Sequence, residues 1–278
     1  QIVINAIEKK DLGIIVAPPG SGKTIVGLKI IADKKQPALI ITHRKQIADQ
    51  WIERIETFLG IPKNEIGKIG QGKTKIGKQI TVAMIQSLSK ELEKPDTGKI
   101  LNAFGTIIVD ECHHIPAETF RNAISKLQTF YLYGLTATPF RKYNDSKLIF
   151  IHLGEVIAEI KSNEISTSKR PKIIIRNTEL DVPFNSKTDK FETLSKILVH
   201  DSSRNKSILG DVINELQSDK KVVIITERKE HIDSLNQYLK QSYEVITLSG
   251  EDSESAKNSK WKLLKEGNYQ VLITTGQF

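Results

Sequence analysis

Short runs of β-branched and aliphatic residues alternate with amphipathic stretches along most of this 278-residue chain. The runs are almost continuously apolar, which is typical of strands that are covered on both faces of a parallel sheet. We expect strands at Gly13–Ala17, Ala38–Thr42, Ile80–Met84, Thr106–Asp110, Tyr131–Thr136, Val222–Thr226, Glu244–Leu248 and Gln270–Thr274. We expect helices at Arg44–Leu59, Arg204–Leu216, Glu230–Leu239 and Ala256–Lys265. This order predicts an α/β fold with parallel sheets.

The alternation is interrupted once, between about Ile160 and Lys190. This stretch is polar and contains two prolines, and its single strand-like piece is Lys172–Arg176. We interpret it as the connection between two α/β domains. The predicted boundaries are 1–160 for the first domain, 161–190 for the connection and 191–278 for the second domain, and both domains have ordinary sizes.

The amino-acid composition limits the kinds of protein that this chain can be. Hydrophobic residues make up 38% and charged residues 27%, which excludes the intrinsically disordered class. No apolar run approaches the ~20 residues of a membrane span, so we expect no membrane partner. One cysteine excludes an internal disulfide and fits a cytoplasmic location. The net charge of +8 permits a polyanionic partner, and the start at Gln-Ile-Val-Ile, without Met or a signal peptide, predicts that other domains accompany this segment.

A glycine-rich string, Ala-Pro-Pro-Gly-Ser-Gly-Lys-Thr at residues 17–24, follows the first expected strand and opens a helix. Its glycines let the backbone amides curl around phosphate oxygens, and the helix N-terminus favours an anion. Lys23 would reach the β- and γ-phosphates of ATP, and Thr24 would ligate Mg²⁺. The strict pattern has Gly in place of Ala17, and an accidental turn is the alternative. The predicted nucleotide-binding residues are Pro19, Gly20, Ser21, Gly22, Lys23 and Thr24.

An acidic string, Asp110-Glu111-Cys112-His113-His114, ends another expected strand. The carboxyl end of a parallel strand is where ligands bind in open α/β sheets. We therefore expect Asp110 to hold Mg²⁺, and Glu111 to orient or deprotonate the water that attacks the γ-phosphate. One alternative is a zinc site made from the cysteine and the two histidines, but adjacent ligands suit a tetrahedral site poorly. Another is an ordinary surface turn.

Eight strings in order resemble the motifs of superfamily 2 helicases. In the expected first domain they are residues 17–24 (motif I), 42–51 (Ia), 82–88, 110–114 (II, DEAH-type) and 134–139 (III). In the expected second domain they are residues 222–232 (IV), 248–250 (IVa) and 271–277 (start of V). The chain is most similar to the branch that contains XPB-like repair helicases and restriction-enzyme translocase subunits. The resemblance covers nearly the whole chain.

The resemblance implies two RecA-like P-loop NTPase domains, each a mainly parallel sheet flanked by helices, with the second incomplete. It implies coupling roles for His113, Thr136 and Thr138. It also implies nucleic-acid contacts for Arg44, Gln86, Ser87, Arg228, Gly250 and Thr275. A solvated charge at Arg44 and ordinary cap hydroxyls at Ser87 and Thr275 are the alternatives.

Two positions depart from the family pattern. Gln1 is either the adenine-reading glutamine of the family or the residue after it. The chain ends at Phe278, before the motif that carries the family's arginine finger. We therefore expect a protein ending there to hydrolyse ATP slowly, and its second sheet to have an exposed edge.

The predicted function is that of an ATP-dependent nucleic-acid helicase or translocase. The DECHH and Thr-Ala-Thr-Pro strings resemble the repair and restriction branch more than the Asp-Glu-Ala-Asp RNA branch, and this resemblance implies DNA rather than RNA as the partner. Two other classes are a small-molecule kinase with the same phosphate loop and a nucleic-acid-binding regulatory module without ATPase activity. The presence of Lys23, Thr24, Asp110 and Glu111 argues against loss of catalysis.

Overall fold

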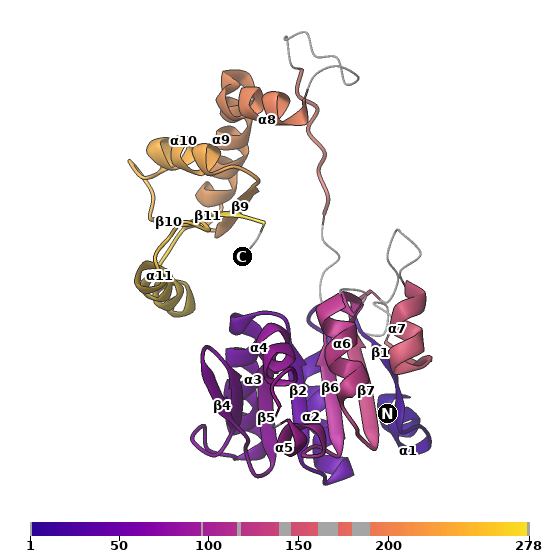
Figure 1. Ribbon diagram of the computed structural model, residues 1–278. Helices are drawn as coiled ribbons and strands as arrows, with labels where there is room; N and C mark the ends of the chain where they lie inside the picture. The colour runs from indigo at the N-terminus through magenta and orange to yellow at the C-terminus, as the bar shows by residue number, and fades with distance from the viewer. Residues whose placement is uncertain are drawn as a thin grey trace. The chain divides into compact units, whose positions relative to one another are not determined.

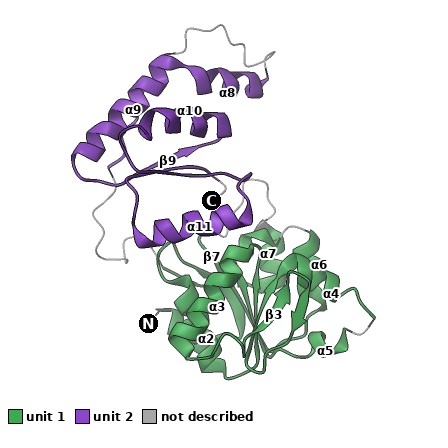
Figure 2. Ribbon diagram, turned by 90° about the vertical axis from the view of Figure 1, so that its left-hand side faces the viewer, with its two compact units in different colours: residues 1–170 green, residues 171–278 purple. Residues whose placement is uncertain are grey.

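The computed structural model describes residues 2–95, 97–115, 118–138, 146–160, 172–179 and 190–276. The chain divides into two compact units, unit 1 with residues 1–170 and unit 2 with residues 171–278 (Figure 2). Gln1 and most of the predicted connection, 161–190, lie outside the described residues.

Unit 1 is built on an eight-stranded sheet (Figure 1). The strand order is β4-β3-β5-β2-β6-β7-β1-β8, and every neighbouring pair is parallel except β3 and β4. The strands are β1 (Leu12–Val16), β2 (Ala38–Thr42), β3 (Gly67–Gly70), β4 (Lys73–Lys75), β5 (Ile80–Met84), β6 (Thr106–Asp110), β7 (Tyr131–Thr136) and β8 (Val156–Glu159). The predicted α/β fold with a mainly parallel sheet is confirmed.

Helices cover both faces of this sheet (Figure 1). One face packs against α1 (Ile2–Lys9), α2 (Lys23–Lys34) and α3 (Lys45–Leu59). The other face packs against α4 (Ile85–Glu91), α5 (Gly98–Leu101), α6 (Glu118–Lys126), α7 (Ser146–Leu153) and the 3₁₀ turn η1 (Cys112–His114). The two-sided cover explains why β2 and β6 are buried along their whole length and are apolar except at three end positions, Thr42, Thr106 and Asp110.

The centre of the sheet should dominate the stability of unit 1. Ile40 of β2 is completely buried. Ile40→Ala is expected to lower the free energy of unfolding by about 2–5 kcal/mol, because the lost methyl groups leave a cavity. The matched control is Ile151→Ala on α7 of the same unit, since Ile151 is 73% exposed, and this change should stay within about 0.5 kcal/mol. Chemical denaturation measures both, and equal effects would contradict this assignment of the core.

Unit 2 contains a parallel three-stranded sheet among the described residues, in the order β10-β11-β9. The strands are β9 (Val222–Thr226), β10 (Val245–Leu248) and β11 (Val271–Thr275). The helices are α8 (Phe191–His200), α9 (Ser202–Gln217), α10 (Lys229–Leu239) and α11 (Glu254–Glu266). In the core of unit 2, apolar side chains of α9 and α10 pack against β11.

One expectation for unit 2 was wrong. Strand β9 is not covered on both faces, because Val223 and Ile225 are 52% and 69% exposed while their neighbours Val222 and Ile224 pack toward the core. The strand-like piece Lys172–Arg176 of the predicted connection pairs with no strand in the described part of the chain. Arg176 of this piece forms a bidentate ion pair with the carboxylate of Asp211 on α9, with N–O distances of 3.0 and 3.1 Å.

No helix in the described part of the chain is both long enough and apolar enough to span a membrane.

Candidate ATP site and nucleic-acid edge

The strand order of unit 1 brings the predicted catalytic strings together. Strand β7 lies between β1 and β6, with Thr136 beside Val16 and Leu135 beside Asp110. Because these strands are parallel, their carboxyl ends meet at one edge of the sheet. The loop after β1, the acidic pair after β6 and the threonines after β7 therefore lie side by side.

The loop after β1 has the backbone of a phosphate cradle. Gly20 and Gly22 have φ angles of 77° and 85°, and no atom lies within 4 Å of where a Cβ would stand at either position. Ser21 Oγ donates a hydrogen bond to Pro18 O at 2.6 Å and tightens the turn. Helix α2 begins at Lys23, and no side chain caps it at Gly22. An open, uncapped helix N-terminus suits an anion.

Lys23 lies between this loop and the acidic pair. Its Nζ donates to Ala17 O at 3.3 Å and stands 3.7 Å from Glu111 Oε1. Both side chains are mostly buried. The ammonium group is therefore held next to the predicted base, where it would meet the phosphates of a bound nucleotide.

Asp110 is a buried carboxylate with both oxygens already fixed. The residue is 7% exposed. Its Oδ2 accepts a hydrogen bond from Trp51 Nε1 at 2.7 Å, and its Oδ1 accepts one from Glu111 N at 3.0 Å. Burial raises the pKa of the Asp110 carboxyl, and the bond from Trp51 acts in the opposite direction. A cation at this position would favour the ionised form.

Glu111 occupies a backbone conformation that is uncommon for a residue with a side chain. Its φ and ψ are 49° and 52°, in the left-handed region. Such conformations gather at functional sites, where the surrounding structure maintains them. A hydrogen bond from His113, whose Nδ1 is 3.2 Å from Glu111 Oε2, lowers the pKa of the Glu111 carboxyl, and the Lys23 charge lowers it further. Glu111 is therefore ionised at neutral pH.

His113 also joins the acidic pair to the end of β7. Its Nδ1 is 3.1 Å from Thr136 Oγ1. The Thr136 hydroxyl donates to Thr138 O at 3.1 Å and accepts from Thr138 N at 3.2 Å. Since the one hydroxyl proton of Thr136 goes to Thr138 O, Nδ1 of His113 must carry a proton, and this single N–H is shared between Thr136 Oγ1 and Glu111 Oε2. Glu111, His113, Thr136 and Thr138 thus form one hydrogen-bonded chain.

The zinc alternative finds no support in the described part of the chain, where no three His, Cys, Asp or Glu side chains are grouped so that they could hold a metal ion. Cys112 is completely buried in the core, and burial raises the pKa of its thiol, which disfavours a thiolate ligand. The rings of His113 and His114 lie 4.3 Å apart, and His114 lies 4.3 Å from the ring of His43. Cys112 therefore acts as a packed core residue here.

The donors at this edge fit a nucleotide with Mg²⁺. Thr24 and Asp110 offer a hydroxyl and a carboxylate oxygen, the ligand type that Mg²⁺ prefers. Lys23 and the open amides of the loop offer positive charge for phosphates. No described residue besides Glu111 is close enough to Lys23 to form an ion pair with it.

Three predicted nucleic-acid residues of unit 1 also reach this edge. Arg44 directly precedes α3, after the end of β2, and is exposed. Gln86 and Ser87 lie in the first turn of α4, after the end of β5. Strands β5, β2 and β6 are parallel neighbours, so these residues follow the same carboxyl edge as Asp110.

In unit 2, Gly250 and Thr275 line one pocket of 430 Å³ at the carboxyl ends of β10 and β11. Lys229, the first residue of α10, lines it too and is ion-paired with Glu251. Sequence reasoning did not identify Lys229, although its position directly after Arg228 was a usable signal.

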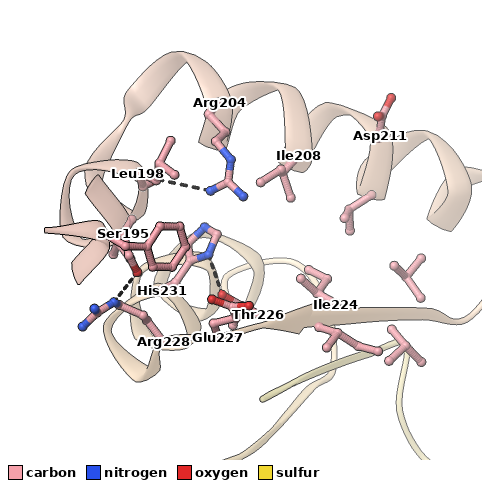
Figure 3. Close-up of a pocket in the computed structure, with 16 residues that line it drawn as sticks. Ser195, Leu198, Arg204, Ile208, Asp211, Ile224, Thr226, Glu227, Arg228 and His231 are labelled. Atoms are coloured by element: carbon pink, nitrogen blue, oxygen red, sulfur yellow. Dashed lines mark hydrogen bonds between the residues drawn. The ribbon is translucent and has the colours of Figure 1, made fainter. Parts of the chain in front are cut away.

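Arg228 lies in a different pocket, of 540 Å³, bounded by α8, α9, β9 and the start of α10 (Figure 3). Its Nε donates to Ser195 Oγ at 2.5 Å. In the same pocket, His231 is bonded to Thr226 at 2.9 Å, and to Asn205 at 2.9 Å on its other nitrogen. The structure therefore does not bring the Arg228 guanidinium together with Gly250 and Thr275.

Similarity to known proteins identifies the family of this chain. The family model described as "Type III restriction enzyme, res subunit" matches residues 1–141. The chain belongs to this family. Membership confirms the predicted place among superfamily 2 helicases, near the XPB-like and type III restriction branch.

Two curated relatives match different shares of the chain. The DNA 3'-5' translocase XPB2 of Sulfurisphaera tokodaii is 31% identical over 195 residues, which is 70% of this chain and 42% of the relative. Protein L396 of Acanthamoeba polyphaga mimivirus, which its name assigns to the ATP-dependent RNA helicases, is 27% identical over 286 residues, 97% of this chain and 53% of the relative. This chain therefore spans about half the length of these relatives.

The fold has a counterpart among solved structures. The helicase domain of Hef from Pyrococcus furiosus matches with a TM-score of 0.64 at 14% identity, over 99% of this chain and 85% of that one. The predicted RecA-like architecture is confirmed by this likeness.

Proposed function

We propose that this chain is the motor core of an ATP-driven nucleic-acid helicase or translocase, and that DNA rather than RNA is its preferred substrate. The observation that carries the proposal is the meeting of Lys23, Asp110 and Glu111 at one sheet edge, with Lys23 Nζ 3.7 Å from Glu111 Oε1. Family membership supports it and argues against the small-molecule kinase alternative.

Each residue of the edge has a chemical task in ATP hydrolysis. The loop Pro19–Thr24 would surround the phosphates, and Lys23 would neutralise charge on the β- and γ-phosphates. Thr24 and Asp110 would hold Mg²⁺, which supplies further neutralisation when bound. The ionised Glu111 would orient the attacking water and accept its proton on a carboxylate oxygen. Water and ATP would yield ADP and phosphate.

The hydrogen-bonded chain after β7 gives hydrolysis a route to the rest of unit 1. Glu111 bonds to His113, which bonds to Thr136 and so to Thr138. A change at Glu111 when the γ-phosphate leaves would alter the bonds of this chain. We assign the coupling of hydrolysis to movement to His113, Thr136 and Thr138.

The nucleic-acid contacts would be made to the backbone. Arg44, Gln86 and Ser87 offer a cation, an amide and a hydroxyl at helix starts, which suit phosphate and sugar and carry no sequence information. In unit 2, Gly250 and Thr275 would contribute, and Lys229 would add a cation if it left its ion pair with Glu251. Arg228 would have to leave Ser195 in order to take part.

DNA is preferred on two grounds. The DECHH and Thr-Ala-Thr-Pro strings resemble the repair and restriction branch, and XPB2 is named a DNA translocase. The name of L396 points to RNA, so RNA is the second candidate substrate.

Binding to nucleic acid is expected to tolerate any sequence and to weaken steeply with salt. Phosphate contacts release counterions, so the logarithm of the affinity should fall linearly with the logarithm of salt concentration, with a slope of about −0.7 per contact on a single strand. Arg44→Ala should reduce that slope by about one contact. Fluorescence anisotropy with two unrelated single strands measures this. A strong preference for one sequence at constant salt would indicate a base-reading module instead.

A further inference from the structure

Trp51 connects helix α3 to the end of β6. Its side chain is 1% exposed and is one of the largest in the core. Its only polar side-chain atom, Nε1, donates to Asp110 Oδ2 at 2.7 Å inside the protein. The two residues are 59 positions apart, so the contact is created by the fold.

Gly27 of α2 makes room for this indole. A Cβ at Gly27 would lie 2.6 Å from Trp51 Cη2 and 3.1 Å from Leu135 Cδ1. The first distance is shorter than real Cβ contacts, so alanine at this position would displace the ring. Glycine inside a helix is unfavourable relative to alanine, and here the close approach of Trp51 explains its presence.

A buried indole usually finds some hydrogen-bond acceptor. Here the acceptor is the carboxylate assigned to Mg²⁺. Asp110 Oδ1 accepts a second bond, from Glu111 N at 3.0 Å, so the carboxylate is held from both sides. Hydrogen bonds that hold a carboxylate in place also fix the orientation of its remaining lone pairs. Groups that donate such bonds to a metal ligand tune the affinity of the metal site.

We propose that Trp51 is a positioning residue that orients Asp110 for Mg²⁺. The proposal rests on the proposed function of the ATP site. Loss of an outer partner of this kind lowers metal affinity by about 10–100-fold. Trp51→Phe keeps an aromatic ring in the core and removes only the donor and the second ring.

The test measures Mg²⁺ binding rather than turnover. A fluorescent ADP analogue is bound to each variant, and the Mg²⁺ concentration that gives half of the Mg²⁺-dependent signal is determined. Trp51→Phe should raise that concentration by about tenfold or more, while binding of the analogue without Mg²⁺ stays unchanged. The matched control is Trp261→Phe on α11, since the chain has two tryptophans. In that control, the Mg²⁺ requirement should stay unchanged, and emission from Trp51 should respond to Mg²⁺.

Gly27→Ala provides an independent route to the same contact. It should also raise the Mg²⁺ requirement, because the displaced ring loses Asp110. In the Trp51→Phe background it should add nothing, since phenylalanine lacks the atom that the new methyl group would strike and the bond is already gone. Thermal unfolding of each variant separates this effect from a loss of stability.

The outcomes distinguish the positioning role of Trp51 from the proposed function of the ATP site. An unchanged Mg²⁺ requirement in Trp51→Phe, with normal nucleotide binding by the unmodified protein, overturns the positioning role and leaves the proposed function standing. If Trp51→Phe does not fold, an unchanged requirement in Gly27→Ala overturns it in the same way. If the unmodified protein binds no nucleotide, the proposed function itself fails.

Discussion

Replacing Lys23 by alanine is expected to lower ATP turnover of the full-length protein by about a thousandfold, because the cation opposite the β- and γ-phosphates is lost. Within the described part of the chain, Glu111 pairs with Lys23 and with His113, so no second lysine or arginine there can replace the lost charge beside the base. A steady-state phosphate-release assay measures the change.

The matched control for Lys23 is Lys29→Ala. Lys29 lies on the same helix, is paired with Asp33 on the surface, and is half exposed. Its replacement should leave turnover unchanged. Turnover of Lys23→Ala within about tenfold of the unmodified protein would contradict the assignment of the phosphate loop, since a single electrostatic partner in a catalytic site is worth more than that.

Glu111→Gln is expected to stop hydrolysis while ATP remains bound. The amide keeps the shape and length of the side chain but cannot accept the proton of the attacking water, which costs about 10²–10⁴ in rate. The left-handed backbone at Glu111 is equally demanding for both residues, so the substitution adds no new backbone strain. Equilibrium ATP binding and single-turnover hydrolysis should be measured on the same preparation.

Glu155→Gln is the control for this change, because Glu155 forms a surface ion pair with Lys10 and is 71% exposed. It should alter neither binding nor hydrolysis. If nucleotide binding collapses together with turnover in Glu111→Gln, then Glu111 serves to hold the nucleotide and the assigned role as a base is wrong.

Several strands could be predicted from the sequence because each is a short, almost continuous run of apolar residues. Strands β2, β5, β6, β7 and β9 begin and end at the predicted residues. Helices α3, α9, α10 and α11 agree with the predicted ranges to within two residues at each end. For the strands of unit 1, the pattern carries this information because strands buried between two layers of helices are apolar along most of their length.

The edges of the sheet could not be predicted in the same way. Strands β3 and β4 are short and rich in glycine and lysine, and β8 has only four residues. Such strands are set by pairing with a neighbour rather than by their own composition. The exposure of Val223 and Ile225 was missed because an apolar run predicts cover on both faces and does not say what provides it.

The residues of the candidate site also fall into two groups, those whose placement the sequence predicts and those whose contacts it does not. The residues at strand ends could be predicted because the carboxyl ends of parallel strands share one edge, whatever the strand order. Contacts between distant elements could not. The spacing of Ala48, Trp51 and Ile55 predicts a buried stripe on α3, but the acceptor of the indole depends on how α3 lies over β6. The bond of Arg228 to Ser195 depends in the same way on α8.

We propose that nucleic acid drives ATP hydrolysis at the edge formed by Lys23, Asp110 and Glu111. The most direct test is the initial rate of ATP hydrolysis by the full-length protein at low salt, without nucleic acid and with single-stranded DNA or RNA of the same sequence. We predict that DNA raises the rate, that RNA raises it less, and that Lys23→Ala shows no response to either. A rate that is as high without nucleic acid as with it would contradict the account.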